Sequence, residues 1–157
     1  MVSMLTIDLL AAHPESLSVL SEWFEAEWPD YYGAGGQGKA LQDLQLYSNE
    51  GCLPVGIVAW RDRQLCGVAA LKASSIESHK HLSPWVAAGF VRPALRGQGV
   101  GAALVGALEQ QARQLGFALV YCATSTAQSL LERRGWQLLE TLEHEGHDVG
   151  IYAKALT

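Results

Sequence analysis

The first third of the chain has a hydrophobic pattern that predicts one strand followed by two helices. Residues 5–9 alternate apolar and polar side chains, as in a half-buried strand. Between Pro14 and Trp28, apolar residues recur at helical spacing and the acidic residues lie largely off that stripe, until Pro29 ends the pattern. The glycine-rich, aromatic segment 30–38 predicts a mobile surface loop, and residues 39–48 predict a second helix.

The rest of the chain alternates further strands and helices. The expected elements are a hairpin over 54–60 and 65–71, a strand over 85–91, a helix over 101–115, a strand over 117–123, a short helix over 127–134, and strands around 136–143 and 149–155. A strand, helix and strand in succession around Gly101 require a parallel crossover. The order of elements therefore predicts an α/β domain.

Composition narrows the classes of protein that fit this pattern. With 157 residues, 49% hydrophobic and 17% charged, the chain suits one compact domain, 1–157, and does not suit disorder. A formal net charge of -5 disfavours general nucleic-acid binding. No run approaches the roughly 18 apolar residues of a membrane helix. We interpret the widely spaced Cys52, Cys66 and Cys122 as small buried hydrophobic residues in a reducing cytoplasm. We therefore expect a cytoplasmic protein with no membrane partner.

The segment between strand 85–91 and helix 101–115 carries the most chemical information. It reads Arg96-Gly97-Gln98-Gly99-Val100-Gly101-Ala102. Glycines at a helix start let a ligand approach the backbone, and the free N–H groups and the macrodipole there favour a phosphate. A turn that serves only strand-to-helix packing is the simpler alternative.

Two well-known phosphate motifs fit this segment poorly. A P-loop requires Gly-Lys-Ser or Gly-Lys-Thr, and no lysine occurs between Lys80 and Lys154. The dinucleotide fingerprint can be laid on Gly97, Gly99 and Ala102, but it requires an acidic residue at the end of the next strand. The run 117–122 contains no carboxylate.

The segment resembles the signature of the GCN5-related N-acetyltransferase (GNAT) family. Arg96-x-x-Gly99-x-Gly101 is similar to that family's (Gln/Arg)-x-x-Gly-x-(Gly/Ala), and residues 127–136, which end in Gly135-Trp136, are similar to its later segment. The resemblance implies a mixed, mostly antiparallel sheet of about seven strands, splayed between the fourth and fifth and flanked by about four helices. It also implies acetyl-coenzyme A as co-substrate.

The resemblance assigns coenzyme contacts to particular positions. Backbone groups of the strand before the turn would pair with the pantetheine arm, and N–H groups of the turn would hold the pyrophosphate. Thr124 stands where an Asn is common in the family. The implied coenzyme-binding residues are Phe90, Val91, Arg96, Gly97, Gln98, Gly99, Val100, Gly101, Ala102 and Thr124.

The resemblance leaves the catalytic groups open. Leu131 occupies the position of the tyrosine that often protonates the departing thiolate. Tyr121 or Tyr152 is expected to substitute, unless the thiolate leaves without direct protonation. The strand 85–89 has no Glu to act as base, so His81 or His79 is the nearest candidate, with a chain of waters or plain loop histidines as alternatives.

The family builds its acceptor site largely from the first two helices and their connection. Here that region is acidic and aromatic, so we predict a pocket for a cationic amine in which carboxylates attract the charge and rings supply cation–π contact. An amphipathic helix with its acids in water is the alternative. The candidate substrate-binding residues are Glu25, Glu27, Trp28, Asp30 and Tyr31.

The predicted function is acetyl transfer from acetyl-CoA to a primary amine of a small molecule or peptide, directly within a ternary complex. A non-catalytic acyl-CoA-binding or regulatory module is the alternative. The cluster His144, Glu145, His147 and Asp148 matches no recognised ligand spacing, so we expect a polar turn and no metal cofactor. A homodimer is implied by analogy alone.

Overall fold

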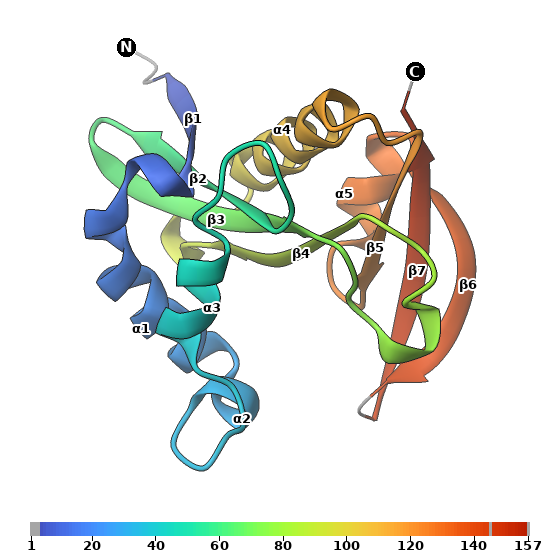
Figure 1. Cartoon of the computed structure of the whole chain (residues 1–157), viewed down its shortest axis with the longest axis horizontal. Helices are drawn as coiled ribbons and strands as arrows, with labels where there is room; N and C mark the ends of the chain where they lie inside the picture. Colours follow the sequence, from blue (N-terminus) through green and yellow to red (C-terminus); the bar gives the residue numbers. More distant parts are fainter. Residues whose placement is uncertain (1–3, 145, 157) are drawn as a thin grey trace.

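The computed structural model describes residues 4–144 and 146–156 and contains one mixed seven-stranded sheet (Figure 1). The sheet order is β1-β2-β3-β4-β5-β7-β6, with β4 and β5 parallel and every other pair antiparallel. The strands are β1 (Leu5–Leu9), β2 (Val55–Arg61), β3 (Gln64–Lys72), β4 (Trp85–Val91), β5 (Leu119–Thr124), β6 (Gln137–His144) and β7 (His147–Ala155). The predicted α/β class and mixed sheet are confirmed.

Helices cover both faces of the first half of the sheet. Figure 1 shows α1 and α3 on one side of β2 and β3, and α4 on the other. Neighbouring residues of β2 face opposite sides, because Val58 packs in the cluster with α1 and α3 whereas Ile57 packs in the cluster with α4. The helices are α1 (Leu17–Glu27), α2 (Pro29–Tyr32), α3 (Ala40–Leu46), α4 (Val100–Gln114) and α5 (Gln128–Arg133).

The expected mobile loop over residues 30–38 is in part a helix, which raises the expected four helices to five among the described residues. Pro29 ends α1 but also begins α2, since its fixed φ suits a first helical position. The glycines that follow serve close packing. A side chain at Gly36 would meet the Tyr31 carbonyl, and one at Gly38 would meet the Tyr31 ring.

The sheet is continuous from β1 to β4 and then divides. Trp85 pairs with Tyr121 and Val86 with Cys122, and no further pair joins β4 to β5 among the described residues. In Figure 1 the two strands diverge beyond this point, with β5, β6, β7 and α5 forming the second half of the molecule. The predicted splay between the fourth and fifth strands is therefore confirmed.

The last two strands form a hairpin, with His144 paired to His147. This agrees with the polar turn expected from the sequence, although Glu145 lies outside the described residues. No group of three or more His, Cys, Asp or Glu side chains is arranged to hold a metal ion in the described part of the chain. Within the same residues, no helix is long and apolar enough to cross a membrane.

Candidate coenzyme site

A cavity of about 860 Å³ opens where β4 and β5 separate. Its walls come from β4 on one side, β5 and α5 on the other, and the turn that begins α4. The end of α1 also reaches the cavity through Glu27 and Trp28. Nine of the ten predicted coenzyme-binding residues line this space; the exception is Gln98.

A bulge in β4 shapes the cavity wall. Val68 pairs with Phe90 and Ala70 with Ala87, so β4 places two residues, Ala88 and Gly89, opposite one residue of β3. Ala88 has a φ of 55°, which is uncommon for a residue with a side chain. Nothing in the amino-acid sequence predicts this bulge, because alanine is not a residue that favours positive φ.

The glycine turn requires its glycines at two positions. Gly97 has a φ of 79° and Gly99 a φ of 88°, both in the left-handed region that other residues rarely adopt. Gly99 is the N-cap of α4, and no atom lies within 4 Å of the Cβ position at either glycine. The first N–H groups of α4 therefore begin a 15-residue helix beside open space, an arrangement suited to an anion.

Arg96 is held against β4 and α1 by three contacts. Its Nε donates a hydrogen bond of 2.9 Å to the Val91 carbonyl, and its guanidinium lies 5.4 Å from the centre of the Phe90 ring. Its Nη2 lies 3.8 Å from Oε2 of Glu27. These contacts fix the guanidinium beside the cavity, where it adds positive charge to the turn.

Gln98 points away from the cavity. Its Oε1 accepts a hydrogen bond of 2.8 Å from Nη1 of Arg61, at the end of β2, and its Nε2 donates to the Ala94 carbonyl at 3.4 Å. Gln98 therefore anchors the turn to the β2–β3 hairpin through its side chain. Gln98 is therefore not brought to the cavity with the other predicted coenzyme-binding residues.

Thr124 closes β5 and organises the start of α5. Its Oγ1 accepts hydrogen bonds from the N–H groups of Thr126 at 3.1 Å and Ala127 at 2.9 Å. Thr124 also lines the cavity. Its hydroxyl oxygen is thus committed to the turn, which leaves the hydroxyl proton as its remaining polar group.

The structure does not bring Tyr121 or His81 to the cavity. Tyr121 packs on the opposite face of β5 from Cys122, with its ring 5.5 Å from that of Trp85. His81 is exposed, and its ring stacks on His79 at 6.0 Å. His79 in turn contacts Glu140 of β6, so this histidine pair lies at the surface between the loop and the edge strand.

Two other residues in the cavity wall bear on the chemistry. Leu131, at the family's frequent tyrosine position, is 1% exposed and lines the cavity with an apolar side chain. Cys122 lines it too, and burial raises the pKa of its thiol to about 12. The thiol is therefore protonated near neutral pH and is not activated as a nucleophile.

The predicted acceptor residues lie in three different places. Glu27 and Trp28 line the cavity, whereas Asp30 and Tyr31 lie exposed on α2. Glu25 borders a separate shallow hollow of about 420 Å³ beside the glycines of residues 33–38. Sequence reasoning missed Arg133, whose side chain adds a second cation to the cavity wall from the end of α5.

Comparison with known proteins agrees with this geometry. The model of the acetyltransferase (GNAT) family matches residues 18–136. The chain therefore belongs to the GNAT acetyltransferase family, as the resemblance indicated. A search of curated protein sequences finds no significant match.

Solved structures share the fold at low sequence identity. An aminoglycoside 6'-N-acetyltransferase complexed with coenzyme A has 14% identity and a TM-score of 0.77, with 97% of each chain covered. The aminoglycoside 6'-N-acetyltransferase from Enterococcus faecium has 15% identity and a TM-score of 0.76, again with 97% of each chain covered. The protein yncA from Salmonella typhimurium, with its cofactor acetyl-CoA, has 17% identity and a TM-score of 0.75, covering 98% of this chain and 94% of its own.

Proposed function

We propose that this protein transfers the acetyl group of acetyl-CoA to a primary amine of a small molecule or peptide. The observation that carries the proposal is the cavity itself, which joins the opening between β4 and β5 to the glycine turn at the start of α4. Its slot-like opening suits a pantetheine arm, and the turn suits a pyrophosphate. Two similar structures were solved with coenzyme A or acetyl-CoA bound, which supports the same ligand here.

Transfer is proposed to be direct, within a ternary complex. The acceptor ammonium first loses one proton to water. The neutral amine nitrogen then attacks the thioester carbonyl carbon, the carbon–sulfur bond breaks, the thiolate leaves with the electron pair, and the nitrogen gives up its second proton to form the neutral amide. The protonated thiol of Cys122 supports this route over an acetyl-cysteine intermediate. Since Tyr121 and His81 lie away from the cavity, we assign the amine proton to ordered water and let the thiolate leave unprotonated.

The acceptor is proposed to be a cationic amine that meets Glu27 and Trp28 at the cavity. These residues supply one carboxylate and one ring face, which is the pair of contacts expected for an ammonium group. We further propose that residues 1–157 form one N-acetyltransferase domain. Cys66 and Cys122 are buried as expected, but Cys52 is exposed, so the expectation that all three are buried is wrong for Cys52. The proposed compartment is the cytoplasm, where all three cysteines would remain free thiols.

A free-thiol assay tests the proposal. Acetyl-CoA would be incubated with a panel of polyamines, aminoglycosides, amino acids and peptide N-termini, and the release of coenzyme A thiol followed by absorbance. We expect at least one amine to raise thiol release well above hydrolysis. No release with any amine, combined with measurable acetyl-CoA binding, would favour the second candidate.

That second candidate is a non-catalytic acyl-CoA-binding or regulatory module. The specific observation in its favour is Leu131, which places an apolar side chain where the family frequently has a proton donor. A binding module would be stabilised by acetyl-CoA without consuming it. Turnover therefore separates the two functions, whereas binding does not.

A further inference from the structure

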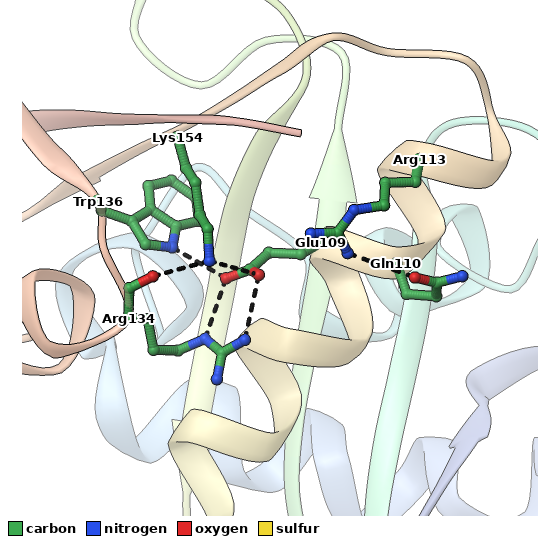
Figure 2. A network of polar contacts seen from close by, with 6 residues as sticks. All are labelled: Glu109, Gln110, Arg113, Arg134, Trp136 and Lys154. Carbon is green, nitrogen blue, oxygen red and sulfur yellow. Dashed lines mark hydrogen bonds and ion pairs between the residues drawn. The ribbon is translucent and has the colours of Figure 1, made fainter. Parts of the chain in front are cut away.

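Three side chains from the second half of the molecule converge on one buried carboxylate of α4 (Figure 2). Glu109 is 1% exposed and receives hydrogen bonds from Arg134, Trp136 and Lys154. The bonds are Arg134 Nε to Oε2 at 3.0 Å, Arg134 Nη2 to Oε1 at 3.1 Å, Trp136 Nε1 to Oε2 at 3.0 Å and Lys154 Nζ to Oε1 at 2.9 Å. We call these four residues the Glu109 network.

The Glu109 network contains more contacts than a single ion pair. Arg134 binds in a bidentate manner, and Lys154 donates a further bond of 2.7 Å to the Arg134 carbonyl. Gly106 lies one turn before Glu109, and a Cβ there would lie 3.0 Å from Nη2 of Arg134. A glycine inside a helix is unfavourable, so its presence fits the space that the guanidinium requires.

The network joins the two halves of the molecule that the cavity separates. Through Leu104 and Leu108, α4 packs in the core cluster formed with β2 and β3. Arg134 directly follows α5, a cavity wall, and Lys154 pairs with Val120 of β5, the opposite wall to β4. Among the described residues, β4 and β5 themselves share only two register pairs. The Glu109 network therefore adds a polar attachment of the far wall to the apolar one that Val120, Leu131 and Tyr152 make in the same core cluster.

None of the four network residues lines the cavity. Glu109 lies nine residues after Val100, about 14 Å along the helix axis from the turn that begins α4. The helix thus carries the glycine turn at its start and, at its middle, binds Arg134 and Lys154, which lie next to the β5–α5 wall. Any shift at Glu109 alters the position of one wall relative to the other.

We propose that Glu109 is a positioning residue for the coenzyme: by holding Arg134 and Lys154 it sets the distance between the β4 wall and the β5–α5 wall. The inference rests on the proposed function, because it assumes that acetyl-CoA occupies the cavity. It goes beyond that function in assigning a role in coenzyme affinity to residues that touch no ligand. Coupling of this kind through packed and hydrogen-bonded side chains is of measurable size.

The test compares coenzyme affinity with stability in matched variants. Lys154→Met keeps the aliphatic stem but removes the charge that ties β7 to Glu109, and Gly106→Ala presses on Arg134. Val58→Ala is the control, since Val58 is buried on the opposite face of the sheet from α4. For each variant we would measure the urea midpoint of unfolding and, by calorimetry at a temperature where the variant is fully folded, the Kd for acetyl-CoA. Hydrogen exchange would be measured without coenzyme.

We expect Lys154→Met and Gly106→Ala to raise the Kd for acetyl-CoA about fivefold, and Val58→Ala to change it less than about twofold at a similar loss of stability. Exchange should increase in β5 and α5 in the two network variants alone. Affinities within about twofold of the wild type in both network variants, or an equal loss in Val58→Ala, would overturn the inference. Absence of acetyl-CoA binding by the wild type would overturn the coenzyme assignment as well.

Glu109→Gln provides a stronger perturbation, because it leaves Arg134 and Lys154 without their shared anion. We expect it to weaken coenzyme binding more than either milder variant does. If it does not fold, Lys154→Met and Gly106→Ala still decide the question. If it folds and binds acetyl-CoA as the wild type does, the positioning role is wrong.

Discussion

Arg96 of the glycine turn and Glu27 at the end of α1 face each other in the cavity wall, with 3.8 Å between Nη2 and Oε2. Both side chains are about half exposed, at 50% and 41%. An exposed ion pair of this kind contributes little to stability. Under the proposed function the pair matters for binding, because a coenzyme phosphate that approached Arg96 would compete with the Glu27 carboxylate already beside it.

We predict that Glu27→Gln tightens acetyl-CoA binding and weakens the amine. Removal of the competing carboxylate should lower the Kd for coenzyme about two- to threefold, and loss of the negative charge should raise the KM for a cationic acceptor. Calorimetry and steady-state kinetics measure the two effects separately. Glu25→Gln is the matched control, since Glu25 does not line the cavity. Equal behaviour of the two variants would contradict the role of Glu27.

A second prediction concerns the left-handed glycine at the start of α4. Gly99→Val should abolish thermal stabilisation by acetyl-CoA, because a β-branched side chain strains the turn and fills the space before the helix. Gly116→Val is the control, as Gly116 has a φ of 90° at the other end of α4 and does not line the cavity. Both variants should lose about 1–3 kcal/mol of stability. Retained stabilisation of Gly99→Val by coenzyme would exclude the proposed phosphate site.

The turn before α5 supplies a third prediction. Thr124→Val leaves the N–H groups of Thr126 and Ala127 without their acceptor, so we expect a loss of about 1–2 kcal/mol in the free energy of unfolding. Thr124→Ser keeps the hydroxyl and should retain most of that stability. Urea denaturation of the three proteins measures the difference. Equal stability of the valine and serine variants would show that these hydrogen bonds are unimportant.

The helices and strands and the glycine turn could be predicted from sequence because they depend on local signals, whereas the splayed sheet was implied by the family resemblance. Strand-like runs and apolar residues at helical spacing predicted the seven strands and the long helix to within a few residues of their observed ends. Gly97 and Gly99 indicated a left-handed backbone conformation that other residues rarely adopt, and both have a positive φ in the structure. The helix expected over 101–115 is observed as Val100–Gln114, and Gly116, with a φ of 90°, follows its C-cap Leu115.

The sequence did not predict which side chains of a strand face the cavity or which distant segments contact each other. The expected catalytic Tyr121 faces away from the cavity because Cys122 takes the inward position on β5. The Glu109 network joins residues 25 and 45 positions apart, and a lone Glu in an amphipathic helix carries no signal of such burial. Contacts between distant segments require the register of the sheet, which composition does not encode.

Acid titration of Glu109 gives a fourth prediction. Burial alone would raise the pKa of this carboxyl, but hydrogen bonds from Arg134, Lys154 and Trp136 outweigh burial and hold the pKa below its ordinary value of 4.5. A lowered pKa in the fold means that the network's stabilisation is complete above pH 4.5 and is lost as the pH falls through the folded-state pKa. Glu109→Gln should cost about 3 kcal/mol near neutral pH and unfold with a weaker dependence on acid. Urea midpoints across the acid range measure both.

His13 should have the opposite pH dependence. Its Nε2 lies 2.7 Å from Asp8 Oδ2 and its Nδ1 lies 3.0 Å from Glu15 Oε1. Its ring is tilted by 44° against that of Trp60, with 4.9 Å between the ring centres. The hydrogen bond with Asp8 is the largest influence and raises the pKa of the imidazole above 6.5, against the opposing effect of burial. The stabilisation from protonated His13 is therefore complete below pH 6.5 and is lost as the pH rises through the folded-state pKa.

Two carboxylate variants test which partner has the larger effect on the pKa of His13. Asp8→Asn removes the largest influence on His13 and should lower its pKa, measured by NMR titration of the ring, more than Glu15→Gln does. His13→Gln should lose stability relative to the wild type at acidic pH and approach it as the pH rises, because the neutral wild-type imidazole has no charge and can donate to only one of the two carboxylates. A larger shift from Glu15→Gln, or a stability difference that grows with pH, would show that the imidazolium does not hold the end of β1 to the turn that precedes α1.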